Sequence, residues 1–132
     1  MTAFADTFYF LALLNSKDRA HGPAVVLSRK SDLRIVTTEW VLTEVADACC
    51  SVSHRGMALR LIQTLRQSPY VHIVASDHRV FQRGLDLYEA RPDKDWSLTD
   101  CISFVIMGEQ GLSEALTGDK HFEQAGFRPV LV

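Results

Sequence analysis

The stretch AFADTFYFLALL, residues 3–14, contains the junction that decides the fold. Its first three residues are small or apolar and predict a short buried strand, and the apolar run from Phe8 to Leu14 predicts a helix over residues 7–14. Asp6 lies between the two, at the carboxyl end of the strand. In open α/β sheets, ligands bind in the crevice outside the strand carboxyl ends, so this junction predicts both a fold class and a place for chemistry.

Short apolar runs alternate with longer helical patterns along the rest of the chain. This alternation predicts an α/β fold with a largely parallel sheet and helices on its faces. The predicted strands are residues 3–5, 34–37, 71–74, 114–117 and 129–132. The predicted helices are residues 7–14, 20–30, 38–50, 55–67, 77–89, 98–109 and 120–125.

Two helix starts carry local signals. Ser76 is a candidate N-cap for the helix over residues 77–89, and Ser97 followed by Asp100 has the form of a capping box. The polar segment 91–95, which contains a proline, predicts a loop between two helices and not a domain boundary.

Composition indicates one globular domain over residues 1–132. Hydrophobic residues make up 47% and charged residues 23%, with only 7 Gly and 4 Pro, which excludes disorder and low-complexity repeats. The net charge of −2 favours no class of partner.

Cys49, Cys50 and Cys101 lack the spacing of a zinc site or a disulfide framework, and no apolar run could span a bilayer. We therefore expect a soluble cytoplasmic protein without membrane contact.

Charge placement is more informative than the total charge. Residues 48–84 contain a single acid, Asp77, and five arginines: Arg55, Arg60, Arg66, Arg79 and Arg83. This pattern is typical of a solvated helix surface, and a phosphate-binding surface is the alternative reading.

Two aspartates occupy equivalent positions at strand ends. Asp6 follows the first strand, and Asp119 follows the strand 114–117 and a glycine turn. If these strands are neighbours, the two carboxylates face each other across the crevice. Helix capping would explain Asp6 equally well, and turn chemistry would explain Asp119.

Two further acids lie in helices. Asp100 begins a helix that is apolar nearly all the way round, where an isolated carboxylate is costly unless a cation or several donors compensate it. Capping explains Asp100 as well. Glu44 lies at the margin of the apolar arc of its helix, where most glutamates reach solvent.

Taken together, the four acids indicate a metal site. Converging carboxylates without a basic partner repel one another, and a divalent cation removes that cost. Oxygen ligands without a Cys or His cluster predict a hard ion, Mg²⁺ or Mn²⁺, which works with substrate phosphates. The pattern therefore indicates phosphoester chemistry.

At this point the sequence resembles a known family. Asp6 in Phe4-Ala5-Asp6-Thr7, Glu44 in Trp40–Val45, Asp100 in Trp96–Cys101 and Asp119 in Leu116–Phe122 resemble the four dispersed acids of the PIN domain, above all of VapC-type toxins. The resemblance covers essentially the whole chain. It implies a three-layer α/β/α fold with strand order 3-2-1-4-5 and Mg²⁺- or Mn²⁺-dependent cleavage of single-stranded RNA. It also implies homodimers and a cognate antitoxin as partners.

The resemblance also implies roles for residues. Asp6, Glu44, Asp100 and Asp119 would hold one or two ions and activate water for in-line attack on phosphorus, leaving 5′-phosphate and 3′-hydroxyl ends. Thr117 matches a small hydroxyl residue of the family and would orient water or Asp119. Thr7 would either do similar work or cap a helix.

Other residues near these motifs have less definite roles. We interpret Asp95 as a loop acid, with an extra metal ligand as the alternative, and His121 as an anchor of the last short helix and not as a general base. Arg60, Arg79 and Arg83 are candidates for contacts with the RNA backbone.

Three alternatives remain open. The first two are a PIN nuclease of RNA maturation or quality control, and a catalytically silent RNA-binding PIN domain. The third is a phosphoacceptor signalling module, which needs a second acid before Asp6, where Ala5 stands, and an acceptor aspartate after the second strand, which ends in threonines.

Overall fold

The structure is a computed structural model that describes residues 1–131. Its sheet has five parallel strands in the order β3-β2-β1-β4-β5, which confirms the expected fold class and strand order. The strands are β1 (Thr2–Ala5), β2 (Arg34–Thr38), β3 (Val71–Val74), β4 (Glu114–Leu116) and β5 (Arg128–Pro129). Strand β1 therefore lies at the centre of the sheet.

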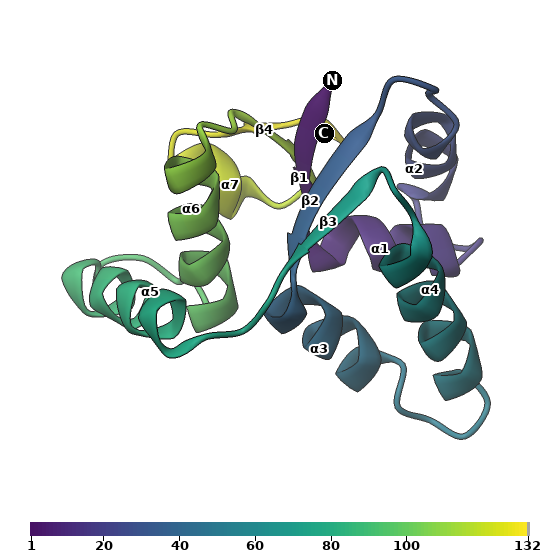
Figure 1. Cartoon of the computed structure of the whole chain (residues 1–132), viewed down its shortest axis with the longest axis horizontal. Coiled ribbons are helices and arrows are strands. Elements are labelled where there is room, and N and C mark those ends of the chain that lie inside the picture. The colour runs from purple at the N-terminus through teal and green to yellow at the C-terminus, as the bar shows by residue number, and fades with distance from the viewer. Residues whose placement is uncertain (132) are drawn as a thin grey trace.

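Seven helices surround this sheet among the described residues. They are α1 (Thr7–Leu14), α2 (His21–Ser28), α3 (Glu39–Ala48), α4 (Arg55–Gln67), α5 (His78–Ala90), α6 (Leu98–Gln110) and α7 (Lys120–Gln124). Figure 1 shows α1, α2 and α4 on one side of the sheet and α6 and α7 on the other, with α5 packed on the outside of α6. The molecule thus has the three layers expected of an α/β/α fold.

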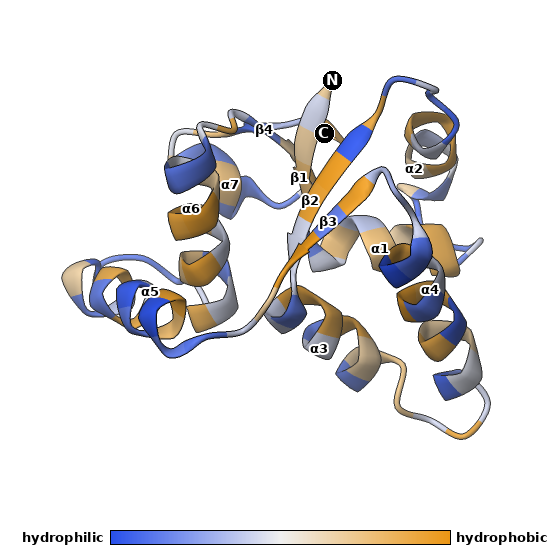
Figure 2. Ribbon diagram, in the orientation of Figure 1, coloured by the Kyte–Doolittle hydropathy of each residue, from blue (hydrophilic) through white to orange (hydrophobic). Residues whose placement is uncertain are grey.

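One continuous core fills the space between these layers. Its largest fully buried side chains come from β1, α1, α6 and α7, and they include Phe4, Tyr9, Phe10, Met107 and Phe122. Figure 2 shows apolar residues concentrated in the strands and on helix α6. Burial of this apolar surface is the main driving force that holds the sheet and helices together.

Most predicted boundaries agree with the structure within two residues, but one predicted cap is wrong. Asp77, and not Ser76, caps α5, because the Asp77 side chain accepts a hydrogen bond from the Val80 N–H at 2.8 Å. The capping box of Ser97 and Asp100 at the start of α6 is confirmed. Asp77 directly precedes the helix, so its carboxylate can accept a hydrogen bond from the N–H of the third helical residue.

The last predicted strand, residues 129–132, partly lies outside the described residues, since Val132 is not described. The strand itself begins one residue earlier, at Arg128. Backbone hydrogen bonds from Val130 to Ala115 and from Leu131 to Thr117 continue the pairing beyond it. None of the helices within residues 1–131 combines the length and apolar character needed to cross a bilayer.

Candidate active site

The candidate site lies where the direction of strand addition reverses. Strands β1 and β4 are parallel neighbours, with Ala5 opposite Leu116, although they come from opposite ends of the chain. Strands β2 and β3 extend the sheet on the other side of β1. Open α/β sheets bind ligands at such a switch point, and Asp6 and Asp119 follow these two strands.

Asp6 occupies the N-cap position of α1, but its carboxylate does not cap the helix. Instead, Oδ2 accepts a hydrogen bond of 3.0 Å from the Thr117 hydroxyl. The residue is only 5% exposed. Burial raises the pKa of the Asp6 carboxyl to about 7, and the charges of Asp100 and Glu44 add to this increase. Capping therefore does not explain Asp6.

Thr117 connects the two strand-end aspartates. Its buried hydroxyl donates to Asp6 and accepts a hydrogen bond of 3.1 Å from the backbone N–H of Asp119. Because the hydroxyl uses its proton in one hydrogen bond and a lone pair in the other, its orientation is fixed. Thr117 thus sets the position of the Asp6 carboxylate relative to the start of α7.

Glu44 reaches the site from α3 with the help of Thr7. The Thr7 hydroxyl donates a hydrogen bond to Oε1 of Glu44, across 37 positions of sequence. Glu44 is half-buried, as its place at the margin of the apolar arc predicts. Its charge is one of those that raise the pKa of Asp6.

Asp100 is buried in the first turn of α6 and has two functions in the structure. Its Oδ2 accepts a hydrogen bond of 3.1 Å from the backbone N–H of Ser97, which completes the capping box. The same oxygen lies 3.1 Å from Nδ1 of His121. Burial raises the pKa of the Asp100 carboxyl, and the charge of Asp119 adds to this effect. Capping accounts for the contact of Asp100 with Ser97, and the contact with His121 belongs to the candidate site.

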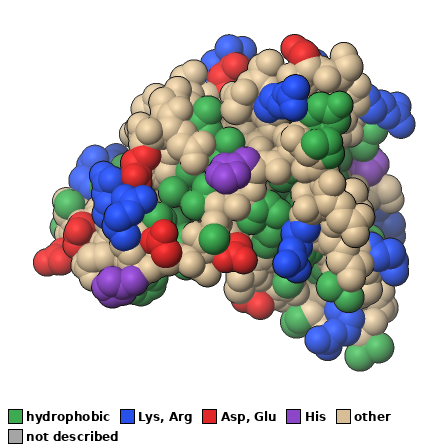
Figure 3. Space-filling view, viewed as in Figure 1, with side chains coloured by type: hydrophobic (Ala, Val, Ile, Leu, Met, Phe, Trp, Pro, Cys, Tyr) green, Lys and Arg blue, Asp and Glu red, His purple; other side chains and the backbone are tan. Residues whose placement is uncertain are grey.

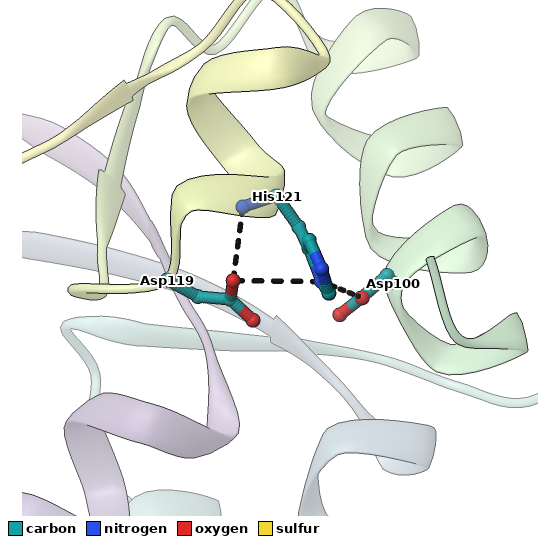
Figure 4. Close-up of side chains that lie close together, drawn as sticks. All are labelled: Asp100, Asp119 and His121. Carbon is teal, nitrogen blue, oxygen red and sulfur yellow. Dashed lines mark hydrogen bonds and ion pairs between the residues drawn. The ribbon is translucent and has the colours of Figure 1, made fainter. Parts of the chain in front are cut away.

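His121 lies in the first turn of α7, and its ring faces two of the predicted site acids. Figure 4 shows its ring pointing between Asp100 and Asp119, with Nδ1 at 3.1 Å from Oδ2 of Asp100 and 3.4 Å from Oδ1 of Asp119. A nitrogen atom therefore lies beside two of the carboxylates that the sequence predicts as oxygen ligands. The sequence carries no direct signal for this contact, since side chains two positions apart on a helix point in different directions.

Among the described residues, the structure thus brings Asp100 and Asp119 together with His121, whereas Asp6 and Glu44 lie outside that group and are related to it through their charges. Asp6 is influenced by Asp100 and Glu44, and Asp100 by Asp119. Asp95, in contrast, is exposed on the loop before α6 and stands outside the group of Asp100, Asp119 and His121.

The donor set fits a divalent cation. Within residues 1–131, no lysine or arginine forms an ion pair with any of the four acids, so His121 is their nearest potential positive charge. A buried carboxylate with a raised pKa and like charges around it is stabilised by a bound cation. The group of Asp100, Asp119 and His121 has ligand atoms that all lie within 4.8 Å of one another, which is compatible with one ion.

The arginines around the site differ in their availability. Arg79 and Arg83 on α5 lie 3.2 and 3.0 Å from Glu109 of α6, so their charge is partly neutralised within the protein. Arg55 and Arg60 on α4 are exposed and make no ion pair with any residue of 1–131. Arg55 and Arg60 therefore have a more available charge for a phosphate than Arg79 and Arg83.

Comparisons with known proteins agree with this fold. The PIN domain family matches residues 3–128. The chain is 28% identical over 131 residues to the 23S rRNA-specific endonuclease VapC20 of Mycobacterium tuberculosis, covering 94% of each chain. The crystal structure of that VapC20, described as a sarcin-ricin loop cleaving toxin, superposes with a TM-score of 0.88 at 24% identity over 98% of each chain.

Two more distant solved structures share the fold. VapBC-1 from nontypeable Haemophilus influenzae has a TM-score of 0.64 at 12% identity, with 95% of this chain and 92% of that one covered. FitAcB from Neisseria gonorrhoeae has the same TM-score at 16% identity, with 98% and 95% covered. Thr38 at the end of β2, where a phosphoacceptor module would carry an aspartate, serves as the N-cap of α3.

Proposed function

Because the chain belongs to the PIN domain family, we propose that it is a metal-dependent endoribonuclease and the toxin of a toxin–antitoxin pair. The observation that carries the proposal is the buried Asp6, which receives no balancing cation from residues 1–131 and lies among three other acids. Such an arrangement is costly in the protein alone and useful for phosphodiester hydrolysis.

Asp6, Glu44, Asp100 and Asp119 are the proposed ligands of the ion, Mg²⁺ or Mn²⁺. When bound, a divalent ion supplies Lewis acidity that makes water a better nucleophile and neutralises charge at the phosphate. Thr117 is proposed as a positioning residue, because its hydroxyl holds the Asp6 carboxylate through a single hydrogen bond. Thr7 holds Glu44 in the same way.

The substrate is proposed to be structured ribosomal RNA. The relative that shares 28% identity over nearly the whole chain is named a 23S rRNA-specific endonuclease. Figure 3 shows Lys and Arg side chains on both sides of one face of the molecule, over α5 and over α4, with acidic side chains between them. Exposed arginines such as Arg55 and Arg60 would bind phosphates without reading sequence, which predicts salt-sensitive binding.

The test is cleavage of purified 23S rRNA with Mn²⁺, Mg²⁺ or a chelator, with the ends mapped by primer extension. The wild-type chain should cut at discrete positions only with the ion. Asp100→Asn should lose at least roughly a hundredfold in rate, since even partners outside the ligand shell cost 10–100-fold. Asp95→Asn is the matched control, because Asp95 is an exposed acid close by in sequence.

Undiminished cleavage by Asp100→Asn would refute the proposed site. Tight RNA binding without cleavage under all ion conditions would instead favour a catalytically silent PIN domain. Cleavage restricted to precursor RNAs would favour a role in RNA maturation or quality control.

The proposed partners are a cognate antitoxin and a second copy of the chain. Expression of the chain should stop growth, and co-expression of a short protein from the adjacent gene should restore it. Sedimentation should give a mass twice that of one 14.8 kDa chain. The three cysteines form no disulfide, which agrees with the proposed cytoplasmic site of action.

A further inference from the structure

Nδ1 of His121 makes one hydrogen bond and one further close contact with a carboxylate oxygen. Nδ1 faces Oδ2 of Asp100 at 3.1 Å and Oδ1 of Asp119 at 3.4 Å. A ring nitrogen carries either one proton or one lone pair, so a single proton cannot make two good hydrogen bonds in different directions. An ion that all three atoms face would satisfy each of them.

The spacing of the three atoms suits common ligands of one ion. Donor atoms about 2.1 Å from an ion lie roughly 3.0 Å apart in adjacent octahedral positions and about 3.4 Å apart in tetrahedral ones. The two observed separations fall in this range.

The fold holds the imidazole in this place. The side chain of Asp119 caps α7 through a hydrogen bond of 2.9 Å from the His121 N–H, which fixes the backbone of both residues. The next residue, Phe122, is fully buried and packs edge-on against Phe104 of α6. Because α6 also carries Asp100, the same packing sets the distance between Asp100 and His121.

We propose that His121 is a nitrogen ligand of the ion held by Asp100 and Asp119, and that it shifts the preference of the site from Mg²⁺ toward Mn²⁺. The proposal rests on the proposed function, since it concerns the same ion. Mg²⁺ favours oxygen ligands and retains its waters, whereas imidazole binds first-row transition ions more strongly than Mg²⁺, with Mn²⁺ the weakest of that series. A mixed set of carboxylates and one imidazole therefore discriminates between the two ions.

The competing explanation is that His121 only positions the Asp100 carboxylate through a hydrogen bond. In that case the ring would stay outside the ligand shell, and asparagine, which also donates a hydrogen bond, would replace it. The two explanations differ in whether nitrogen is bonded to the ion, which spectroscopy of bound Mn²⁺ measures without any RNA.

The experiment uses the full chain loaded with Mn²⁺ and measures electron spin echo modulation from coordinated ¹⁴N. The variants are His121→Asn and, as the matched control, His78→Asn, because His78 is exposed at the start of α5. The affinities for Mn²⁺ and Mg²⁺ are measured by calorimetry on the same samples. Circular dichroism and thermal melting verify that each variant is folded.

The proposal predicts ¹⁴N modulation in the wild-type chain and in His78→Asn, and its loss in His121→Asn. His121→Asn should weaken Mn²⁺ binding by roughly tenfold or more and change Mg²⁺ binding much less. Bound Mn²⁺ without ¹⁴N modulation in the wild-type chain would overturn the inference and leave the proposed nuclease site intact, as would modulation that persists in His121→Asn. Failure of the wild-type chain to bind either ion would overturn the proposed metal site itself.

Discussion

At the scale of single residues, the buried Asp6 carboxyl lowers the stability of the metal-free protein while it supplies an oxygen ligand to the proposed site. The buried carboxyl has a pKa of about 7, against an ordinary value of 3.8. Between these values the folded state binds a proton that the unfolded state has lost. Stability of the metal-free protein therefore falls as pH rises from about 4 to 7, in contrast to the usual behaviour of a salt-bridged aspartate.

This linkage predicts that Asp6→Asn stabilises the metal-free chain at pH 8. Three pKa units correspond to roughly 4 kcal/mol, which is the upper limit of the gain. Little gain is expected at pH 4, where the folded state is protonated and the unfolded-state carboxyl is close to its own pKa of 3.8. Asparagine retains an oxygen that accepts from Thr117. The measurement is urea unfolding in chelator at both pH values, with Asp47→Asn on the exposed side of α3 as control. A gain of equal size at both pH values would contradict the assigned origin.

At the scale of elements, the contact between α5 and α6 positions the part of the chain that carries Asp100. The helices approach closely at Gly84, where an added Cβ would lie 2.3 Å from Cγ1 and 3.2 Å from Cα of Ile102. Arg79 and Arg83 of α5 also pair with Glu109 of α6. These contacts explain why the helix with the site acid is held firmly although α5 lies outside the sheet.

Gly84→Ala should therefore destabilise the protein by about 1–3 kcal/mol, because the new methyl group has no room beside Ile102. Gly108→Ala, in the exposed last part of α6, is the matched control. A Cβ there meets nothing within 4 Å, so the higher helix propensity of alanine should give a gain of up to about 1 kcal/mol. The urea concentrations at the unfolding midpoint should move in opposite directions for the two variants. Equal shifts would show that the contact between α5 and α6 has room for the added methyl group.

At the scale of the whole molecule, the site joins segments that are distant in the sequence. Asp6 follows β1, Glu44 lies in α3, Asp100 begins α6 and Asp119 precedes α7. An ion bound among them links the centre of the sheet to helices of two layers, so its binding energy stabilises the folded state as a whole.

Mn²⁺ should consequently raise the melting temperature, and more at pH 8 than at pH 5, where the proton on Asp6 competes with the ion. A free-ion concentration of 100 times Kd stabilises the folded state by about 2.7 kcal/mol. Differential scanning calorimetry at both pH values measures the effect, and Asp100→Asn should remove most of it. A rise that is larger at pH 5, or that survives in Asp100→Asn, would place the ion elsewhere.

The sequence by itself determined the strands, the helices and the ends of the sheet at which the acids lie. It could do so because hydrophobic periodicity and strand-end positions are local properties. The alternation of strands and helices predicted a parallel sheet, and the strand order followed from a family resemblance carried by short motifs. The capping box of Ser97 and Asp100 was readable for the same reason, since both partners lie within one helical turn.

Only the tertiary structure decided which polar groups meet. Asp6 bonds Thr117 across 111 positions and not the helix it begins, His121 turns toward Asp100 across 21 positions, and Arg79 meets Glu109 instead of remaining free. Each of these side chains has an acceptable local partner or solvent as an alternative. The choice between them depends on rotamers and distances that exist only once α6, α7 and the sheet have packed around one core.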